Sequence, residues 1–284
     1  MLIAQITDIH LGFEQGNPDE LNQKRLEQAI AALLALEPRP DLLLVTGDVA
    51  DGGDDREAYQ RFRAATAQLP FPVFALPGNH DGRAAFAEAF GEVPGAGGFV
   101  QYAIEQWPVR ILVLDSLDEG RHGGAFCEAR AGWLAARLDE ARERPTLIAL
   151  HHPPSETGLS WMGEHREVPW ALRLEALVLG RANIVGVVAG HIHRPIVTQW
   201  AGTTLAICPS VAPQVALDLG ELDADRPDGR PMIVEGPPAF ALHLWTGRQL
   251  LSHFATAAEP PVLARFTPRL QPLLRKLARE REER

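Results

Sequence analysis

Five short polar motifs, separated by tens of residues, contain histidine, aspartate and asparagine side chains that can bind divalent metal ions. In chain order they are Asp8-Ile9-His10, Gly47-Asp48, Gly78-Asn79-His80-Asp81, His151-His152 and Gly190-His191-Ile192-His193. A mixture of imidazole and carboxylate ligands suits Zn, Mn, Fe or Co better than Mg or Ca. The seven candidate ligands are too many for one ion, but they suit two ions that share a bridging carboxylate. The motifs therefore predict a centre of two divalent metal ions.

Each motif directly follows a short apolar run that is typical of a buried β-strand. The runs are Leu2–Ile6, Leu42–Val45, Val73–Leu76, Ile111–Leu114, Leu147–Leu150 and Ile184–Val188, and all except the fourth end in a candidate ligand. Segments with helical apolar periodicity lie between them, at Asp19–Glu37, Arg56–Leu69, Arg83–Phe90, Glu128–Arg142 and Ala171–Leu179. This alternation predicts a layered α/β fold with mostly parallel strands. Ligands bind at the carboxyl ends of such strands, so we expect the five motifs to converge on one site.

The pattern changes after residue 195. Alternating segments predict antiparallel strands that complete a second sheet, at Ile196–Trp200, Thr203–Ile207, Phe240–Trp245 and Gln249–Ala255. The stretch Pro209–Pro238 contains six prolines and no periodicity, which indicates a long surface loop or lid. The tail Arg269–Arg284 is charged and favours helix. Its sequence leaves open whether it packs at an edge, mediates homo-oligomer assembly or frays.

Composition excludes several classes of partner and location. The chain has 284 residues with 27 Lys and Arg against 37 Asp and Glu, so its net charge of −10 should repel nucleic acids and anionic membranes. No apolar run approaches the roughly 18 residues of a membrane span, and we expect no signal peptide because Asp8 interrupts the first apolar run. Cys127 and Cys208 have no metal-finger or disulfide spacing. We therefore expect a cytoplasmic protein.

Taken in order, the five motifs resemble those of the calcineurin-like metallophosphoesterases, and they span residues 8 to 193. Within that superfamily, three features most resemble the bacterial class III cyclic-nucleotide phosphodiesterases and glycerophosphodiesterases: Tyr59-Gln60 before Pro72-Val73, His151-His152-Pro153-Pro154, and the hairpin Gly190-His191-Ile192-His193. The resemblance implies an α/β fold, a four-layer α-β-β-α sandwich of two mixed sheets, over residues 1–257. A partly helical C-terminal extension would follow over residues 258–284.

The resemblance also implies roles for the candidate ligands. Asp8, His10 and His193 would hold one ion, Asn79, His151 and His191 would hold the other, and Asp48 would bridge both. His152 is an alternative to His151. We prefer His151 because it comes first after its strand and lies 40 residues before His191, close to the spacing of the family.

His80 resembles the family histidine that faces the substrate phosphate, with Asp81 a candidate to orient its imidazole. The protein Ser/Thr phosphatases of the superfamily have an arginine after the GD motif that grips a phosphomonoester, whereas this chain has glycine there. Loss of a bidentate arginine favours a monoanionic phosphodiester as substrate. Arg56 lies close enough in sequence to take the place of that arginine.

The implied activity is hydrolysis of a small-molecule phosphodiester, such as a 3′,5′-cyclic nucleotide like cyclic AMP, by a hydroxide that bridges the two ions. Asn79, His80 and Trp161 are the expected substrate contacts, with Trp161 either part of a substrate lid or of a packed loop. The alternatives are a glycerophosphodiester phosphodiesterase and a non-catalytic metal-binding scaffold. A DNA repair nuclease is disfavoured by the charge of the chain.

The remaining polar residues have no ligand spacing. We expect His122, His165, His243 and His253 to be surface or core residues rather than ligands. Asp115 ends the fourth apolar run without a histidine and is expected to be a structural hydrogen-bonding residue. The acidic stretch Asp223–Asp228 is expected to be a solvated loop.

Overall fold

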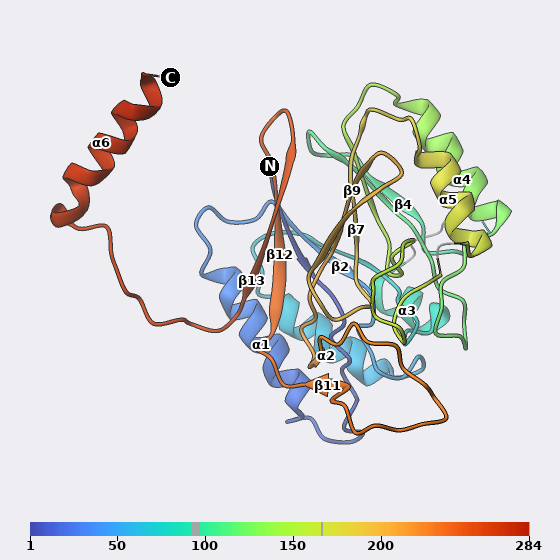
Figure 1. The fold of residues 1–284 in the computed structure, drawn as a ribbon. Helices are drawn as coiled ribbons and strands as arrows, with labels where there is room; N and C mark the ends of the chain where they lie inside the picture. The colour runs from blue at the N-terminus through green and yellow to red at the C-terminus, as the bar shows by residue number, and fades with distance from the viewer. Residues whose placement is uncertain (92–96, 166, 284) are drawn as a thin grey trace.

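Two mixed β-sheets pack against each other in the computed structural model, which describes residues 1–91, 97–165 and 167–283 (Figure 1). The first sheet has the strand order β13-β12-β1-β2-β3. Its parallel part consists of β1 (Leu2–Ile6), β2 (Leu42–Thr46) and β3 (Val73–Leu76). Three helices pack on its outer face, namely α1 (Leu21–Leu34), α2 (Arg56–Thr66) and α3 (Arg83–Phe90).

The second sheet has the strand order β4-β5-β6-β7-β9-β8. Its central strands β5 (Arg110–Val113), β6 (Thr146–Ala149) and β7 (Ile184–Ala189) are parallel, and β4 (Tyr102–Ile104) pairs with β5 in the antiparallel direction. The helices α4 (Glu128–Glu140) and α5 (Pro169–Val178) cover its outer face.

A third apolar cluster joins the inner faces of the two sheets. Ile3, Leu42 and Leu44 of the first sheet pack with Ile111 and Leu147 of the second, and all five side chains are fully buried. Helices, sheet, sheet and helices therefore form four successive layers. This arrangement confirms the predicted α-β-β-α sandwich.

The prediction that the late antiparallel strands all complete one second sheet is wrong. The hairpin of β8 (Ile196–Trp200) and β9 (Thr203–Ile207) extends the second sheet through β7. The hairpin of β12 (Ala239–Trp245) and β13 (Leu250–Thr256) instead joins the first sheet, where β12 pairs antiparallel with β1. Alternation of apolar residues identifies the two faces of a strand but not its partner, which explains the error.

The stretch 209–238 begins inside the protein and continues on its surface. The backbone amides of Val211 and Ala212 donate to the carbonyl oxygens of Thr7 and Asp8, which fastens the start of the stretch beside the first motif. β10 (Gln214–Val215) then pairs with β11 (Ile233–Val234), and the residues between them are mostly exposed. The chain ends in a short 3₁₀ turn, η1 (Pro268–Leu270), and α6 (Gln271–Glu282). None of the helices described is long and apolar enough to cross a membrane.

A buried polar chain links the two sheets next to the site. His243 of β12 lies 2.7 Å from Ser252 Oγ and 2.8 Å from Gln5 Oε1, and Gln5 Nε2 donates to Thr46 Oγ1 and to the Ala189 carbonyl. Because Gln5 uses its oxygen as the acceptor, His243 donates from Nε2 and accepts the Ser252 hydroxyl at Nδ1. His243 is therefore a neutral core residue, as the sequence predicts.

Burial, with a smaller contribution from His253, lowers the pKa of His243 to about 4 from an unfolded value of 6.5. The unfolded chain binds this proton first as the pH falls, so the group costs stability progressively between pH 6.5 and pH 4. We expect the free energy of unfolding to fall by about 2 kcal/mol more in the wild type than in a His243→Gln variant when the pH is lowered from 7 to 5. Urea unfolding at both pH values measures this difference. Equal losses in the two proteins would contradict it.

Candidate metal centre

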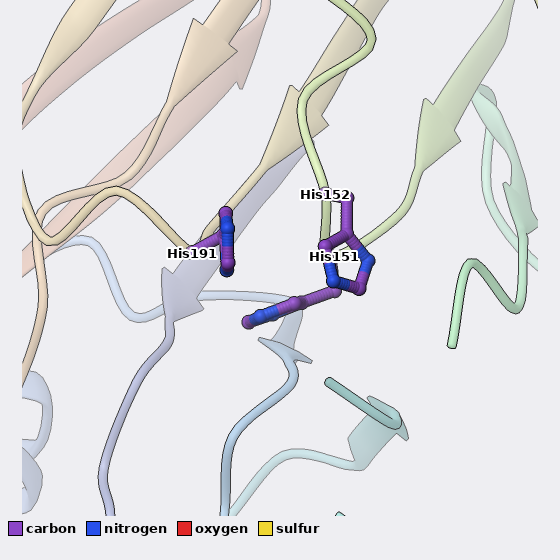
Figure 2. A group of neighbouring side chains, drawn as sticks. All are labelled: His151, His152 and His191. Atoms are coloured by element: carbon purple, nitrogen blue, oxygen red, sulfur yellow. The ribbon is translucent and has the colours of Figure 1, made fainter. Parts of the chain in front are cut away.

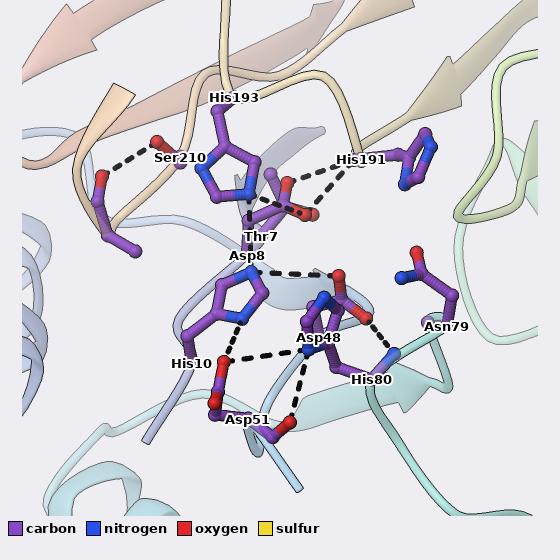
Figure 3. A network of polar contacts seen from close by, with 12 residues as sticks. Thr7, Asp8, His10, Asp48, Asp51, Asn79, His80, His191, His193 and Ser210 are labelled. Atoms are coloured by element: carbon purple, nitrogen blue, oxygen red, sulfur yellow. Dashed lines mark hydrogen bonds and ion pairs between the residues drawn. The ribbon is translucent and has the colours of Figure 1, made fainter. Parts of the chain in front are cut away.

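The five motifs converge at one end of the sandwich, where the parallel strands of both sheets finish (Figure 3). Asp8 follows β1, Asp48 follows β2 and Asn79 follows β3, all in the first sheet. His151 follows β6 and the pair His191 and His193 follows β7 in the second sheet. The nitrogen and oxygen atoms of the aspartates and histidines form overlapping groups of three whose atoms lie within 4.8 Å of one another.

The backbone at these strand ends adopts an unusual conformation. Asp8, His10, Asp48, His191 and His193 have φ values between 51° and 73°, and Ala201 is the one further non-glycine residue with positive φ in the described part of the chain. Left-handed backbone is costly for residues with a Cβ, and such strain gathers at functional sites. A side chain at Gly78 would also overlap Asp48 and His151. The chain therefore uses strained turns and glycine to aim its side chains into the crevice.

The first group of ligand atoms comes from Asp8, His10 and His193. The Nε2 atoms of His10 and His193 face each other at 3.2 Å, and Asp8 Oδ1 lies 3.6 Å from His193 Nε2. The Nδ1 atoms are held from outside, that of His10 by the Asp51 carboxylate at 3.0 Å and that of His193 by the Pro213 carbonyl at 2.8 Å. Outer partners of this kind fix an imidazole so that its other nitrogen can bind a metal. The group therefore fits a divalent cation placed between the two Nε2 atoms.

The second group comes from Asn79, His151 and His191. His151 Nδ1 donates to the Thr46 carbonyl at 2.7 Å, which leaves Nε2 directed inward at 3.1 Å from Asn79 Oδ1. The His191 ring lies near that of His151, with centroids 5.1 Å apart and an interplanar angle of 71° (Figure 2).

The alternative ligand His152 leaves the same strand end in another direction, with its ring perpendicular to that of His151. Its Nδ1 lies 2.9 Å from Ser116 Oγ and its Nε2 3.2 Å from the His122 carbonyl. Burial, followed by the nearby His151, lowers the pKa of His152 well below its ordinary value, so the ring is neutral. Both nitrogens of His152 contact groups outside the ligand set, whereas His151 Nε2 is directed at Asn79 and Asp48, so the geometry favours His151 as the ligand although His152 lies in one group with His151 and His191.

Asp48 lies between the two groups. Its Oδ2 atom is 3.6 Å from His10 Nε2 and 3.3 Å from His151 Nε2, and its Oδ1 accepts the backbone N–H of His80 at 2.8 Å. Burial alone would raise the pKa of Asp48, but the adjacent His151 and His10 hold it well below its ordinary value. Burial likewise opposes charge on His151, yet Asp48 and Asp8 raise its pKa to about 9. The site therefore favours added positive charge, and one carboxylate oxygen is placed to serve both groups.

His80 and Asp81 have different surroundings from those expected. His80 Nδ1 lies 3.1 Å from the Asp51 carbonyl and 3.5 Å from the Asp51 carboxylate. The Asp81 carboxylate instead accepts the backbone N–H groups of Val49, Ala50 and Gly78 and the Tyr59 hydroxyl. Asp81 thus ties the second motif to the third, whereas the direct partner of the His80 ring is Asp51. The expectation that Asp81 orients the imidazole is corrected accordingly.

A cavity of about 320 Å³ opens over the two groups. His80, Asn79 and Trp161 line it, as expected of substrate contacts, together with apolar residues from other segments: Phe13, Leu21, Met162, Val215 and Ile233. Trp170, in the first turn of α5, is buried in the core instead. Trp161 therefore belongs to an apolar wall that faces the polar side chains of the two groups.

Sequence reasoning missed two residues of the site. His122 was expected to be an ordinary histidine, but its ring packs on that of His191 with centroids 4.6 Å apart, and its Nδ1 lies 3.5 Å from Asn79 Nδ2. Asp51, in the turn after Asp48, was not among the expected site residues. His122 stands alone in a glycine-rich loop and carries no spacing signal. Asp51 could have been found, because it lies three residues after Asp48 on the same strand exit.

Other expectations on polar residues are met. Asp115 is fully buried and binds Arg83 through two hydrogen bonds, of 2.8 and 3.1 Å, and it also accepts the Val100 amide. His165 and His253 are exposed. Arg56 forms an ion pair with Glu88 at 2.9 Å on an exposed surface and is absent from the cavity lining. The arginine that the sequence left as a substitute clamp is therefore occupied elsewhere.

The fold and the site together define a two-sheet α/β sandwich with a candidate dinuclear metal centre at its strand ends. Residues 1–195 match the family model of the calcineurin-like phosphoesterases, and the chain belongs to this family. Calcineurin-like phosphoesterases use a centre of two divalent metal ions, and the aspartate and histidine groups described above fit such a centre.

Two curated relatives cover most of the chain. It is 31% identical over 257 residues to the probable glycerophosphodiester phosphodiesterase GpdQ of Arcobacter nitrofigilis, an alignment that covers 89% of this chain and 91% of that protein. It is 34% identical over 215 residues to the 3′,5′-cyclic adenosine monophosphate phosphodiesterase CpdA of Escherichia coli strain K12, with 75% and 76% covered. Among solved structures, a dimetal phosphatase from Danio rerio matches with a TM-score of 0.65 at 15% identity, over 91% of this chain and 97% of that one. The last likeness concerns the fold alone.

Proposed function

We propose that this chain is a metal-dependent phosphodiesterase that hydrolyses 3′,5′-cyclic nucleotides or small linear phosphodiesters. Relatives named as phosphodiesterases for cyclic AMP and for glycerophosphodiesters support the reaction class. The observation that carries the preference for a diester is the charge of the cavity. The described residues that line it include no lysine or arginine, whereas Glu14, Asp48 and Asp51 contribute carboxylates; the carboxylate of Glu20 is buried and paired with Arg61. A monoanionic diester suits this wall better than a dianionic monoester.

The proposed metal ligands are Asp8, His10 and His193 for one ion, Asn79, His151 and His191 for the other, and Asp48 for both. The mixed nitrogen and oxygen donors favour Fe, Mn, Zn or Co. When bound, two such ions supply Lewis acidity that activates water and polarises the phosphoryl oxygens.

The protein side chains would then bind and orient the substrate. His80 donates from Nδ1 to Asp51, which leaves Nε2 as the nitrogen that can hold a proton for the departing alkoxide. Asp81 is a positioning residue, since it fixes the turns that carry Asp48 and Asn79. Trp161 and Phe13 offer apolar surface to the alcohol part of the ester, which suits a purine ring.

Metal analysis followed by a substrate screen tests the proposal. We expect about two transition-metal ions per chain, loss of activity on chelation, and higher kcat/KM for cyclic AMP and glycerophosphodiesters than for simple phosphomonoesters. A Trp161→Ala variant should lose more turnover of cyclic AMP than of a glycerophosphodiester. A protein that binds no metal and gains no activity with manganese would support the non-catalytic scaffold, and higher kcat/KM for monoesters would contradict the diester preference.

We also propose a cytoplasmic location and a small-molecule substrate rather than a nucleic acid. Both cysteines are free thiols, which a reducing compartment preserves, and the net charge of −10 opposes nucleic-acid binding. Fractionation of cells and a nuclease assay on single- and double-stranded DNA test these two statements.

A further inference from the structure

The last residues of the chain form an arm that lies apart from the two sheets. After the Ala257 amide donates to the Pro238 carbonyl, residues 258–283, here called the C-terminal arm, run to α6, which stands clear of both sheets (Figure 1). The hydrogen bonds and ion pairs that the structure gives for side chains of this arm stay within it, as in the pair of Lys276 with Glu280. The arm therefore has no fastening to its own body in the described structure.

The arm exposes several large apolar side chains to solvent. Leu263 is 96% exposed and Phe266 71%, and one face of α6 carries Leu273, Leu274 and Leu277 at helical spacing. A helix of 12 residues is marginal by itself, and most helices persist because an apolar face packs on something. Exposed apolar side chains gathered in this way mark an interaction surface.

Charge indicates the nature of the partner. Seven of the 27 lysines and arginines and four of the 37 acidic residues fall in residues 258–284, so this end has a net charge of +3 and residues 1–257 one of −13. Opposite charges of this size favour association of the arm with an acidic surface such as the body of this same protein.

One surface of residues 1–257 carries both exposed apolar side chains, which can pack against the leucines of the arm, and exposed acidic side chains, which can pair with its basic residues. In residues 216–228, here called the acidic loop, Leu217 and Leu219 are exposed at about two thirds each. Asp218 and Asp228 pair with Arg230, but Glu221, Asp223 and Asp225 are exposed and form no ion pair within the described residues. The loop lies beside the site, because Ser160, next to Trp161, donates to the Gly220 carbonyl.

The linker to α6 directs this helix away from its own acidic loop, which favours contact with the acidic loop of another molecule. Pro260 and Pro261 stiffen the ten residues that precede η1, and an extended segment of this length spans about 30 Å. Figure 1 shows that this linker carries α6 away from β11, where the acidic loop of the same chain returns to the body. Two molecules related by a twofold axis can each place an arm on the loop of the other.

We propose that the C-terminal arm docks on the acidic loop of a second copy of this chain, so that two molecules exchange arms in a homodimer. The leucines of α6 pack against Leu217 and Leu219, and Lys276 and Arg281, the basic residues that helical spacing places beside these leucines, lie against Asp223 and Asp225. This assembly is independent of the proposed enzymatic activity.

Sedimentation equilibrium of the full-length chain and of charge-reversed variants tests the proposal. The wild type is expected to be a dimer at micromolar concentration. Lys276→Glu with Arg281→Glu should weaken self-association at least about tenfold, and so should Asp223→Lys with Asp225→Lys. Combining all four substitutions should restore the dissociation constant to within about threefold of the wild type, because the opposite charges then face each other again.

Apolar variants provide a matched control. Leu273→Asp on α6, where the side chain is 51% exposed, should weaken the dimer at least about tenfold, whereas Leu172→Asp on α5, where it is 46% exposed, should leave it unchanged. Circular dichroism confirms that both variants are folded.

Three results would overturn the proposal. A wild-type monomer at every concentration would do so, whether the arm then folds onto its own body or binds vesicles of phosphatidylserine and phosphatidylcholine. A dimer that is insensitive to the arm substitutions would place the interface elsewhere. Failure of the four-residue combination to restore association would show that arm and acidic loop do not meet.

Discussion

Replacing Asp48 with alanine is expected to reduce kcat/KM by about 10³-fold or more and to lower the metal content from two ions to at most one. Asp48 Oδ2 lies between the two groups of ligand atoms, 3.6 Å from His10 Nε2 and 3.3 Å from His151 Nε2. Its removal takes one negative ligand from both ions at once. Metal activation of a phosphoryl group is worth several kcal/mol of barrier, which corresponds to a loss of this size.

Two further variants separate the bridge from a general effect on folding. Asp48→Asn keeps an oxygen for the His80 amide but removes the charge, so it should also lose metal although it remains folded. His193→Ala removes a ligand from one group only and is expected to release one ion. Elemental analysis, together with turnover, distinguishes the three proteins. If Asp48→Ala kept ordinary turnover while His193→Ala lost it, the bridging role of Asp48 would be wrong.

The positions of the candidate ligands could be predicted because the chain places each of them directly after a buried strand. Leu2–Ile6 is apolar except for Gln5 and Ile184–Ala189 is apolar throughout, and a strand buried on both faces can be recognised from such a composition. The two strands lie in different sheets, but both sheets end their parallel strands at the same side of the sandwich, where the His191 amide donates to the Asp8 carboxylate at 2.9 Å although 183 positions separate the two residues. The convergence followed from topology rather than from any local motif.

What the sequence did not predict depends on contacts between segments that carry no periodic signal. β12 pairs with β1 across nearly the whole chain, and its alternating residues would suit either sheet equally well. His122 reaches the site from a loop whose path is set by Ala125 and Glu164, which bind the neighbouring backbone. Likewise, Asp51 contacts His10 and His80 from a turn that begins at Asp48, where the backbone has positive φ. Such contacts can be identified only from the three-dimensional structure.

Replacing His80 with alanine is expected to lower kcat by about 10² to 10⁴ while both metal ions remain bound. His80 lines the cavity, and its Nδ1 is turned toward Asp51, so that Nε2 remains to face a substrate. The residue thus contacts the centre through its backbone N–H, which donates to Asp48, and alanine keeps that bond. A loss of activity without loss of metal is the signature of a group that acts on substrate rather than on the ions.

Comparison of leaving groups identifies what His80 does. An alkoxide is a poor leaving group and needs a proton, whereas a nitrophenolate departs without one, so the loss in kcat should be greater for cyclic AMP or a glycerophosphodiester than for a nitrophenyl diester. The exposed His253 provides a matched control. His253→Ala removes an imidazole on β13, away from the centre, and should change kcat for neither class of ester. Equal losses of kcat on both classes of ester would show that His80 positions the phosphate and does not protonate the leaving group. Loss of one ion from His80→Ala would instead make His80 a ligand, because its ring lies in one group with His10 and Asp48.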